Sequence, residues 1–339
     1  MNGHPADTRD HLLLLAPRVA EIVSSTDPFA LEVRHAVGSW TGLAGDPAQA
    51  MVLLREVLED SRAALGPDHP DTLARRHTLA RWTGEAGDPA RAVEELRALL
   101  PAQSRLLGPN HRETLRIRYG VAYWSGEAGH SHETLRLLGE LIGDQERELG
   151  EEHPDSLRTR HGIGLWSGMV GDPAEAVRVL GGLLPVRERV LGPENPDTLR
   201  TLNNLGRWYG VLRDYPRALE YLRDTYGRRE RVLGPDHPDT MRTVNNIIDV
   251  TGESGDYRGA YELADQLLPR QQRVLRDHHQ DTMRTRFNRA RWLAAAGDTT
   301  TALEQLRALL SDQEAALDSE HPDLVRTAAK VEELTAPDG

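Results

Sequence analysis

The sequence predicts an all-α solenoid, in which copies of one helix–turn–helix hairpin stack along an axis. Three observations predict this fold: a repeat of 42 residues, the confinement of every tryptophan to one slot of that repeat, and helix start and stop signals at fixed places within it. One hairpin of this size cannot bury its own apolar face, whereas stacking against its neighbours does so.

The 42-residue period continues without insertion or deletion. An acidic residue recurs at Asp71, Glu113, Asp155, Asp197, Asp239, Asp281 and Asp323. A glycine recurs at Gly45, Gly87, Gly129, Gly171, Gly255 and Gly297, and Arg213 stands in the one missing slot. The tryptophans are Trp40, Trp82, Trp124, Trp166, Trp208 and Trp292, with Val250 in the seventh slot. We expect this tryptophan stripe to pack between helices rather than to form a ligand cage.

Residues 66–107 show the helix signals of one unit. Gly66 and Pro67 end the preceding helix, and acidic residues around Pro70 mark the next helix start. Gly87 ends that helix, and Asp88 caps the second one. Apolar residues follow the helical spacing of one packed face in both. Prolines late in the second helix of alternate repeats, Pro101, Pro185 and Pro269, predict a kink or an early end there.

The repeats define the expected domain organisation. Seven units cover residues 29–322, preceded by an N-terminal capping helix within residues 1–28 and followed by a C-terminal capping helix and tail over residues 323–339. Terminal helices with a polar outer face keep such a stack in solution.

Composition excludes several classes of function. The net charge of −12 argues against bulk attraction to nucleic acid or to anionic membranes. The chain has no cysteine, which excludes disulfides, thiolate metal sites and a cysteine nucleophile. That composition fits a reducing cytoplasm, and neither a targeting segment nor a membrane span is evident. No phosphate-binding glycine loop of the G-x-x-x-x-G-K-[ST] type occurs, and we predict no cofactor and no metal.

The run "LGPDHPDTL…LA…GEAGDPARA" resembles the tetratricopeptide repeat in its 42-residue, kinesin-light-chain-like form. The signature alanine of the second helix falls at Ala50, Ala92, Ala176, Ala218, Ala260 and Ala302, with Thr134 as a departure. The asparagine pairs of that form appear at Asn203-Asn204 and Asn245-Asn246. The resemblance covers about residues 29–335 and implies a right-handed superhelix. Similar arrays are common in GC-rich actinobacteria, and they serve many unrelated complexes.

The resemblance also implies which face binds, because in this family the first helices line a concave groove. With Ala80 as position eight of its repeat, groove positions are two, five and nine. Position two holds Glu32, Ala74, Arg116, Arg158, Arg200, Arg242, Arg284 and Arg326. Position five holds His35, His77, Tyr119, His161, Asn203, Asn245 and Phe287. Position nine holds Ser39, Arg81, Tyr123, Leu165, Arg207, Asp249 and Arg291. The predicted groove is therefore basic.

We predict a protein-interaction scaffold or adaptor that binds an acidic peptide segment of a partner protein, since arginine forks bind carboxylates with two hydrogen bonds. The family's two-carboxylate clamp would map onto Asn203, Arg207, Asn246, Arg284 and Asn288, of which Asn246 and Arg284 match in type. The predicted partner-binding residues are Arg116, Arg158, Arg200, Asn203, Arg207, Arg242, Asn245, Asn246, Arg284, Asn288, Arg291, His77, Tyr119, Tyr123 and His161.

Four alternatives stay open at this stage. The arginines could instead pair with acids of neighbouring helices, at about 0–1 kcal/mol a pair. The chain could be a sensor of a short peptide or metabolite, or a reader of single-stranded RNA. Groove histidines such as His77 and His161 could serve an enzyme, but no accompanying triad or carboxylate pair is evident, so we predict none. The histidines that precede "P-D" are expected to cap helices in loops rather than bind metal.

Overall fold

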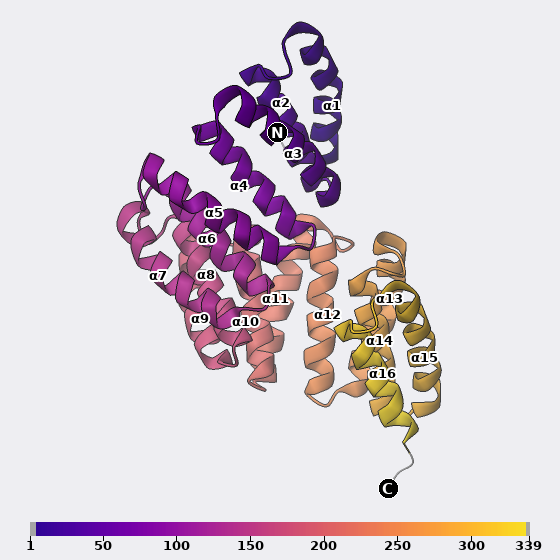
Figure 1. The fold of residues 1–339 in the computed structure, drawn as a ribbon. Helices are drawn as coiled ribbons and strands as arrows, with labels where there is room; N and C mark the ends of the chain where they lie inside the picture. Colours follow the sequence, from indigo (N-terminus) through magenta and orange to yellow (C-terminus); the bar gives the residue numbers. More distant parts are fainter. Residues whose placement is uncertain (1–4, 337–339) are drawn as a thin grey trace. The chain divides into compact units, whose positions relative to one another are not determined.

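The computed structural model describes residues 5–336, which form sixteen α-helices and no strand (Figure 1). The helices are α1 (Pro5–Ile22), α2 (Pro28–Leu43), α3 (Pro47–Leu65), α4 (Pro70–Glu85), α5 (Pro89–Leu107), α6 (Arg112–Glu127), α7 (Ser131–Leu149), α8 (Pro154–Met169), α9 (Pro173–Leu191), α10 (Pro196–Val211), α11 (Tyr215–Leu233), α12 (Pro238–Glu253), α13 (Tyr257–Leu275), α14 (Gln280–Ala295), α15 (Thr299–Ala316) and α16 (Pro322–Thr335). The all-α prediction is confirmed.

The chain divides into two compact units, residues 1–170 with α1–α8 and residues 171–339 with α9–α16. Within each unit every helix packs against the next one along the chain, as the ribbon of Figure 1 shows. First helices also contact the first helices of adjacent repeats, such as α4 with α6 and α10 with α12. This is the stacking that a hairpin repeat needs to bury its apolar face. No helix within residues 5–336 has the length and apolar character needed to cross a membrane.

The histidines before "P-D" cap the first helices, as predicted. The backbone N–H of Asp71 donates to His69 Nδ1 at 3.2 Å, and that of Asp155 donates to His153 Nδ1 at 3.1 Å. Asn195 Oδ1 takes the same place in front of α10. Each acceptor satisfies a backbone donor that would otherwise lack a partner at the helix start. These histidines therefore have a structural role within their loops.

The turns between paired helices need a left-handed residue. Gly87 there has φ 101°, which glycine adopts without the penalty of a Cβ atom. Arg213 occupies the equivalent place in front of α11 with φ 60° and is one of two non-glycine residues with positive φ among those described. A non-glycine residue in this region costs of the order of 1 kcal/mol.

The tryptophan stripe is packing between repeats. Trp82, Trp124 and Trp166 are each 5–6 % exposed. Each indole lies on a glycine of the preceding first helix, and a Cβ atom built on those glycines would come within 2.5, 2.6 and 2.2 Å of the ring. The glycines are Gly42, Gly84 and Gly126, respectively. The prediction of packing rather than a ligand cage is confirmed for this part of the stripe.

Of the two outcomes predicted at the late prolines, a kink or an early end, the early end is wrong. α5 continues through Pro101 to Leu107, the same length as α7, which has no proline. Leu99 and Gln103 on either side of Pro101 are both buried. Their packing holds the helix across the one missing backbone hydrogen bond.

Candidate functional site

In unit 1 the position-two arginines are largely neutralised by acids. Asp155, whose side chain is 4 % exposed, accepts from Arg112 Nε at 3.3 Å and from Arg116 Nε at 3.4 Å. Arg158 lies 3.4 Å from its other oxygen. Burial would by itself raise the pKa of Asp155, but Arg116, Arg158, Arg112 and His153 outweigh it and leave the pKa lowered. The alternative that the arginines pair with acids of a neighbouring helix therefore holds for Arg116, whose partner is on α8.

Asp155→Asn is expected to lower the free energy of unfolding by about 2–4 kcal/mol, because neutral Asn would leave the arginines around this buried site unbalanced. Urea denaturation measures the loss. Asp71→Asn is the matched control, since Asp71 fills the same repeat slot but is exposed and meets only His69. The pKa of Asp155 is lowered in the folded state. Asp155 therefore gives a higher free energy of unfolding than Asn above the ordinary carboxyl pKa of 3.8, and this difference is lost as the pH falls through the folded-state pKa. An equal cost at both positions would contradict this role.

The aromatic and histidine residues of unit 1 are also engaged with their neighbours. Tyr119 and Tyr123 stack with ring centroids 6.3 Å apart, and the Arg158 guanidinium lies 5.7 Å from the Tyr119 ring. His161 is buried. Burial lowers the pKa of His77, with Glu113 opposing and Arg116 adding to the effect. His77 is thus neutral at pH 7 and adds no positive charge to this face.

In unit 2 the asparagines of the predicted site lie inside the packing. Asn245 is fully buried; its Oδ1 accepts from Thr285 Oγ1 at 2.6 Å. Asn246 Nδ2 donates to Asn203 Oδ1 at 3.0 Å, and its own Oδ1 accepts from Arg284 at 3.0 Å. Asn288 is 2 % exposed. The amides of Asn203, Asn245 and Asn246 link neighbouring first helices, and the buried Asn245 and Asn288 are not presented to a ligand in this structure.

The arginines of unit 2 differ in how far they are neutralised. Arg242 meets Asp239 at 3.0 Å and Asp281 at 3.2 Å. Arg284 and Arg291 share Asp249. Among the described residues, Arg200, whose side chain is 59 % exposed, forms an ion pair with Asp197 on its own helix and with no other acid. The positive charge left available is therefore smaller than the sequence alone suggests.

Arg207 is the exception among these arginines. Within residues 5–336 no acid lies at ion-pair distance from it; its guanidinium is 6.0 Å from the Trp208 ring centroid. The side chain is exposed to solvent, yet desolvation beside the surrounding protein, followed by the nearby charge of Arg284, lowers its pKa, while Asp249 raises it. An exposed guanidinium that has no ion-pair partner within residues 5–336 is accessible to an anion.

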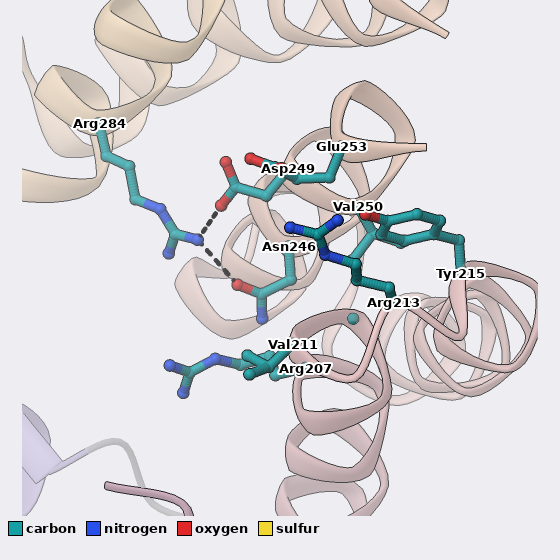
Figure 2. A pocket seen from close by; sticks show the side chains of 10 residues that line it. Arg207, Val211, Arg213, Tyr215, Asn246, Asp249, Val250, Glu253 and Arg284 are labelled. Carbon is teal, nitrogen blue, oxygen red and sulfur yellow. Dashed lines mark hydrogen bonds and ion pairs between the residues drawn. The ribbon is translucent and has the colours of Figure 1, made fainter. Parts of the chain in front are cut away.

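Arg207 lines a pocket of about 350 Å³ between the ends of α10 and α12 and the start of α11 (Figure 2). Arg213, Tyr215, Asp249, Val250, Glu253 and Arg284 are among its other lining residues. Figure 2 shows Arg284 reaching both Asp249 and Asn246, while no such bond is drawn for Arg207 or Arg213. We take this as the candidate site, which includes Arg207, Asn246 and Arg284 of the predicted clamp.

Two departures from the repeat meet at this pocket. Val250 replaces the tryptophan of six other repeats, and Arg213 replaces the turn glycine. Both substitutions are visible in the sequence as interruptions of the 42-residue pattern. Their convergence on one pocket with Arg207 was not predicted, since it depends on how the turn after α10 meets α12.

Comparison with family models identifies the repeat. The tetratricopeptide repeat model matches residues 31–71, 72–113, 156–197 and 198–239. The chain carries tetratricopeptide repeats. These matched segments fall in both units and follow the 42-residue period. A search of curated proteins finds no significant match.

Solved structures with tetratricopeptide repeats are similar to this chain. The nearly identical repeats of a putative kinesin light chain from Podosopora anserina are 25 % identical, with a TM-score of 0.52 over 61 % of this chain and 99 % of that one. A Rap protein in complex with competence and sporulation factor is 10 % identical, with a TM-score of 0.63 over 97 % of each chain. A signal transduction ATPase with a tetratricopeptide repeat sensor from Pyrococcus horikoshii is 10 % identical, with a TM-score of 0.62 over 98 % of this chain and 50 % of that one. The last two likenesses concern the fold alone.

Proposed function

We propose that the chain is a scaffold or adaptor whose unit 2 binds an acidic peptide segment of a partner protein at Arg200 and Arg207 on α10. Tetratricopeptide repeats form extended interaction surfaces, and the Rap protein structure contains a bound factor on the same fold. The observation that carries the proposal is that Arg207, in a chain of net charge −12, has no acid at ion-pair distance within residues 5–336. The function is one of binding, without a chemical step.

The charges around α10 support an acidic ligand. Arg200 and Arg207 are seven residues apart on one helix and so share a face. Arg200 has only an exposed partner on its own helix, which contributes little to stability. A carboxylate of a partner would gain charge-assisted hydrogen bonds there with a small desolvation cost. Arg116 and Arg242 are instead bound to Asp155 and Asp281, so we place the acidic segment on α10.

The test is selection of binders from a random peptide library, followed by titration of the selected peptide. We expect a consensus rich in Asp and Glu, and a loss of affinity of about tenfold or more for the double variant Arg200→Glu, Arg207→Glu. Binding should also weaken as salt is raised, because the contacts are exposed. Circular dichroism should show unchanged helicity.

The matched control carries the same charge change elsewhere in unit 2. Arg223→Glu and Arg258→Glu lie on α11 and α13, and both side chains are exposed. We expect this control to bind the peptide within about twofold of the wild type at 0.15 M salt, since long-range effects are screened. Equal losses in both variants, or a consensus without acids, would rule out the α10 site.

A further inference from the structure

In the last repeat a tryptophan, Trp292, occupies the position that corresponds to Val250 at the pocket. Trp292 on α14 stacks on Tyr257, with ring centroids 5.9 Å apart and an angle of 14° between the rings. Its indole rests on Gly252, where a Cβ atom would come within 2.2 Å of the ring. The Arg291 guanidinium covers it, 4.1 Å from the centroid. A planar ring therefore lies between a tyrosine, a glycine and a guanidinium.

One repeat earlier the tyrosine and the glycine are present, but the tryptophan and the arginine are replaced. Tyr215 and Gly210 stand 42 residues before Tyr257 and Gly252, while Val250 and Asp249 stand in place of Trp292 and Arg291. Val250 packs against Gly210, where a Cβ atom would lie 3.0 Å from the valine, but its side chain is much smaller than an indole. Gly210 is accordingly half-buried, whereas Gly252 is buried. The remaining space opens into the pocket of about 350 Å³.

The charges that line this slot leave a positive surplus. Asp249 is held by Arg284 and Arg291, and Glu253 lies 3.7 Å from Arg291. Within residues 5–336, Arg207 and Arg213 have no acid at ion-pair distance, and both line the pocket. Arg213 is kept at φ 60°, where the other repeats use glycine and avoid the strain. A strained residue that persists beside a cavity points to a binding role.

We propose that this slot, bounded by Tyr215, Gly210 and Val250, binds a small aromatic carboxylic acid. The ring of the ligand lies in the pocket beside Val250, in the volume left by the smaller side chain, and stacks on Tyr215. Its carboxylate meets the guanidinium groups of Arg207 and Arg213. The carboxylates of Asp249 and Glu253 on the same rim disfavour a doubly charged phosphate. The site adds a small-molecule ligand to the proposed peptide function and shares only Arg207 with it.

Calorimetric titration with indole-3-acetate tests the proposal. We expect one saturable site with a Kd on the order of 0.1–1 mM, the range for a ligand of this size. Indole without the carboxylate should bind about tenfold or more weakly, and adenosine monophosphate should bind no better than indole-3-acetate. Absence of saturable binding, or equal binding of indole, would overturn the proposal. Tighter binding of the phosphate would overturn the assignment of a carboxylic acid.

Val250→Trp is the decisive variant, because it restores the residue that six other repeats carry. The new indole should occupy the slot, raise the melting temperature and abolish binding of indole-3-acetate. Tyr215→Ala, which removes the stacking surface and leaves the cavity open, should weaken binding about tenfold. Arg213→Gly restores the turn consensus and should weaken the acid more than indole. Unchanged affinity in folded Val250→Trp would place the ligand elsewhere and sink the proposal.

The same variants distinguish binding of the aromatic acid in the pocket from binding of the acidic peptide. Val250→Trp leaves Arg200 and Arg207 in place, so it should retain the selected acidic peptide while losing indole-3-acetate. Failure of peptide selection with intact binding of indole-3-acetate would refute the peptide proposal alone. Peptide binding that depends on Arg200 and Arg207, together with no binding of any ring, would refute the slot alone.

Discussion

Replacing Trp124 by alanine is expected to lower the free energy of unfolding of unit 1 by about 3–5 kcal/mol. The indole is 6 % exposed and lies on Gly84 of the preceding repeat. It belongs to an apolar cluster with residues of α4, α5 and α6, including Leu96 and Ile117. Its loss leaves a cavity that joins two repeats, and the stability of a solenoid depends on such interfaces between neighbours.

Urea denaturation followed by circular dichroism measures the loss, and hydrogen exchange locates it. We expect faster exchange in α4–α7 and unchanged exchange in α12–α16 of unit 2. Tyr123→Ala is the control, since Tyr123 is the preceding residue, makes an edge contact with the Trp124 ring and is only partly buried. It should cost about 1–2 kcal/mol. If Trp124→Ala were no worse than Tyr123→Ala, the stripe would not be the packing that joins the repeats.

The fold could be predicted in detail because the repeat fixes both helix ends. Pro70 and Gly87 recur in phase with the apolar positions, so the boundaries of α4 follow from the sequence within a residue or so. The late prolines show the limit of such local signals. Pro101 predicts a kink or an early end, but α5 continues to Leu107, because burial of Leu99 and Gln103 on both sides of the proline outweighs one lost hydrogen bond.

The candidate site could be predicted only in part, since helix periodicity gives a face but not the partners on it. The arginine line lies on first helices as expected, yet whether an arginine is available depends on acids one repeat away. Arg116 reaches Asp155 across 39 positions, whereas Arg207 reaches no acid within residues 5–336. The burial of Asn245 and Asn288 likewise depends on how closely neighbouring first helices approach.

Two residues that line the pocket depart from the repeat in the sequence itself. Val250 and Arg213 are each recognisable in the sequence as an exception to the repeat, and both line one pocket in the structure. That they meet there could be learned only from the structure, because the turn after α10 faces α12 only in the folded chain.

The second prediction concerns the glycines beneath the indoles. Gly126→Ala is expected to lower the free energy of unfolding of unit 1 by about 1–3 kcal/mol, although alanine is the better helix former. The added Cβ atom would come within 2.2 Å of the Trp166 ring, which is buried and cannot move away freely. Gly143→Ala in α7 is the control: nothing lies within 4 Å of its Cβ atom, and it should gain about 0.5–1 kcal/mol.

A double-mutant cycle then isolates the contact between glycine and ring. Unit 2 contains the equivalent pair with a valine in place of the tryptophan. A Cβ atom on Gly210 would lie 3.0 Å from Val250, whereas one on Gly126 would lie 2.2 Å from the Trp166 ring. Once Trp166 is replaced by valine, the alanine at position 126 should therefore cost about 1 kcal/mol or less, so that the two substitutions are strongly non-additive. Urea denaturation of the four proteins measures the coupling. Additive costs would mean that these glycines are needed for the conformation of the first helix and not for contact with the indole. The smaller Val250 side chain would then not explain the pocket beside Gly210.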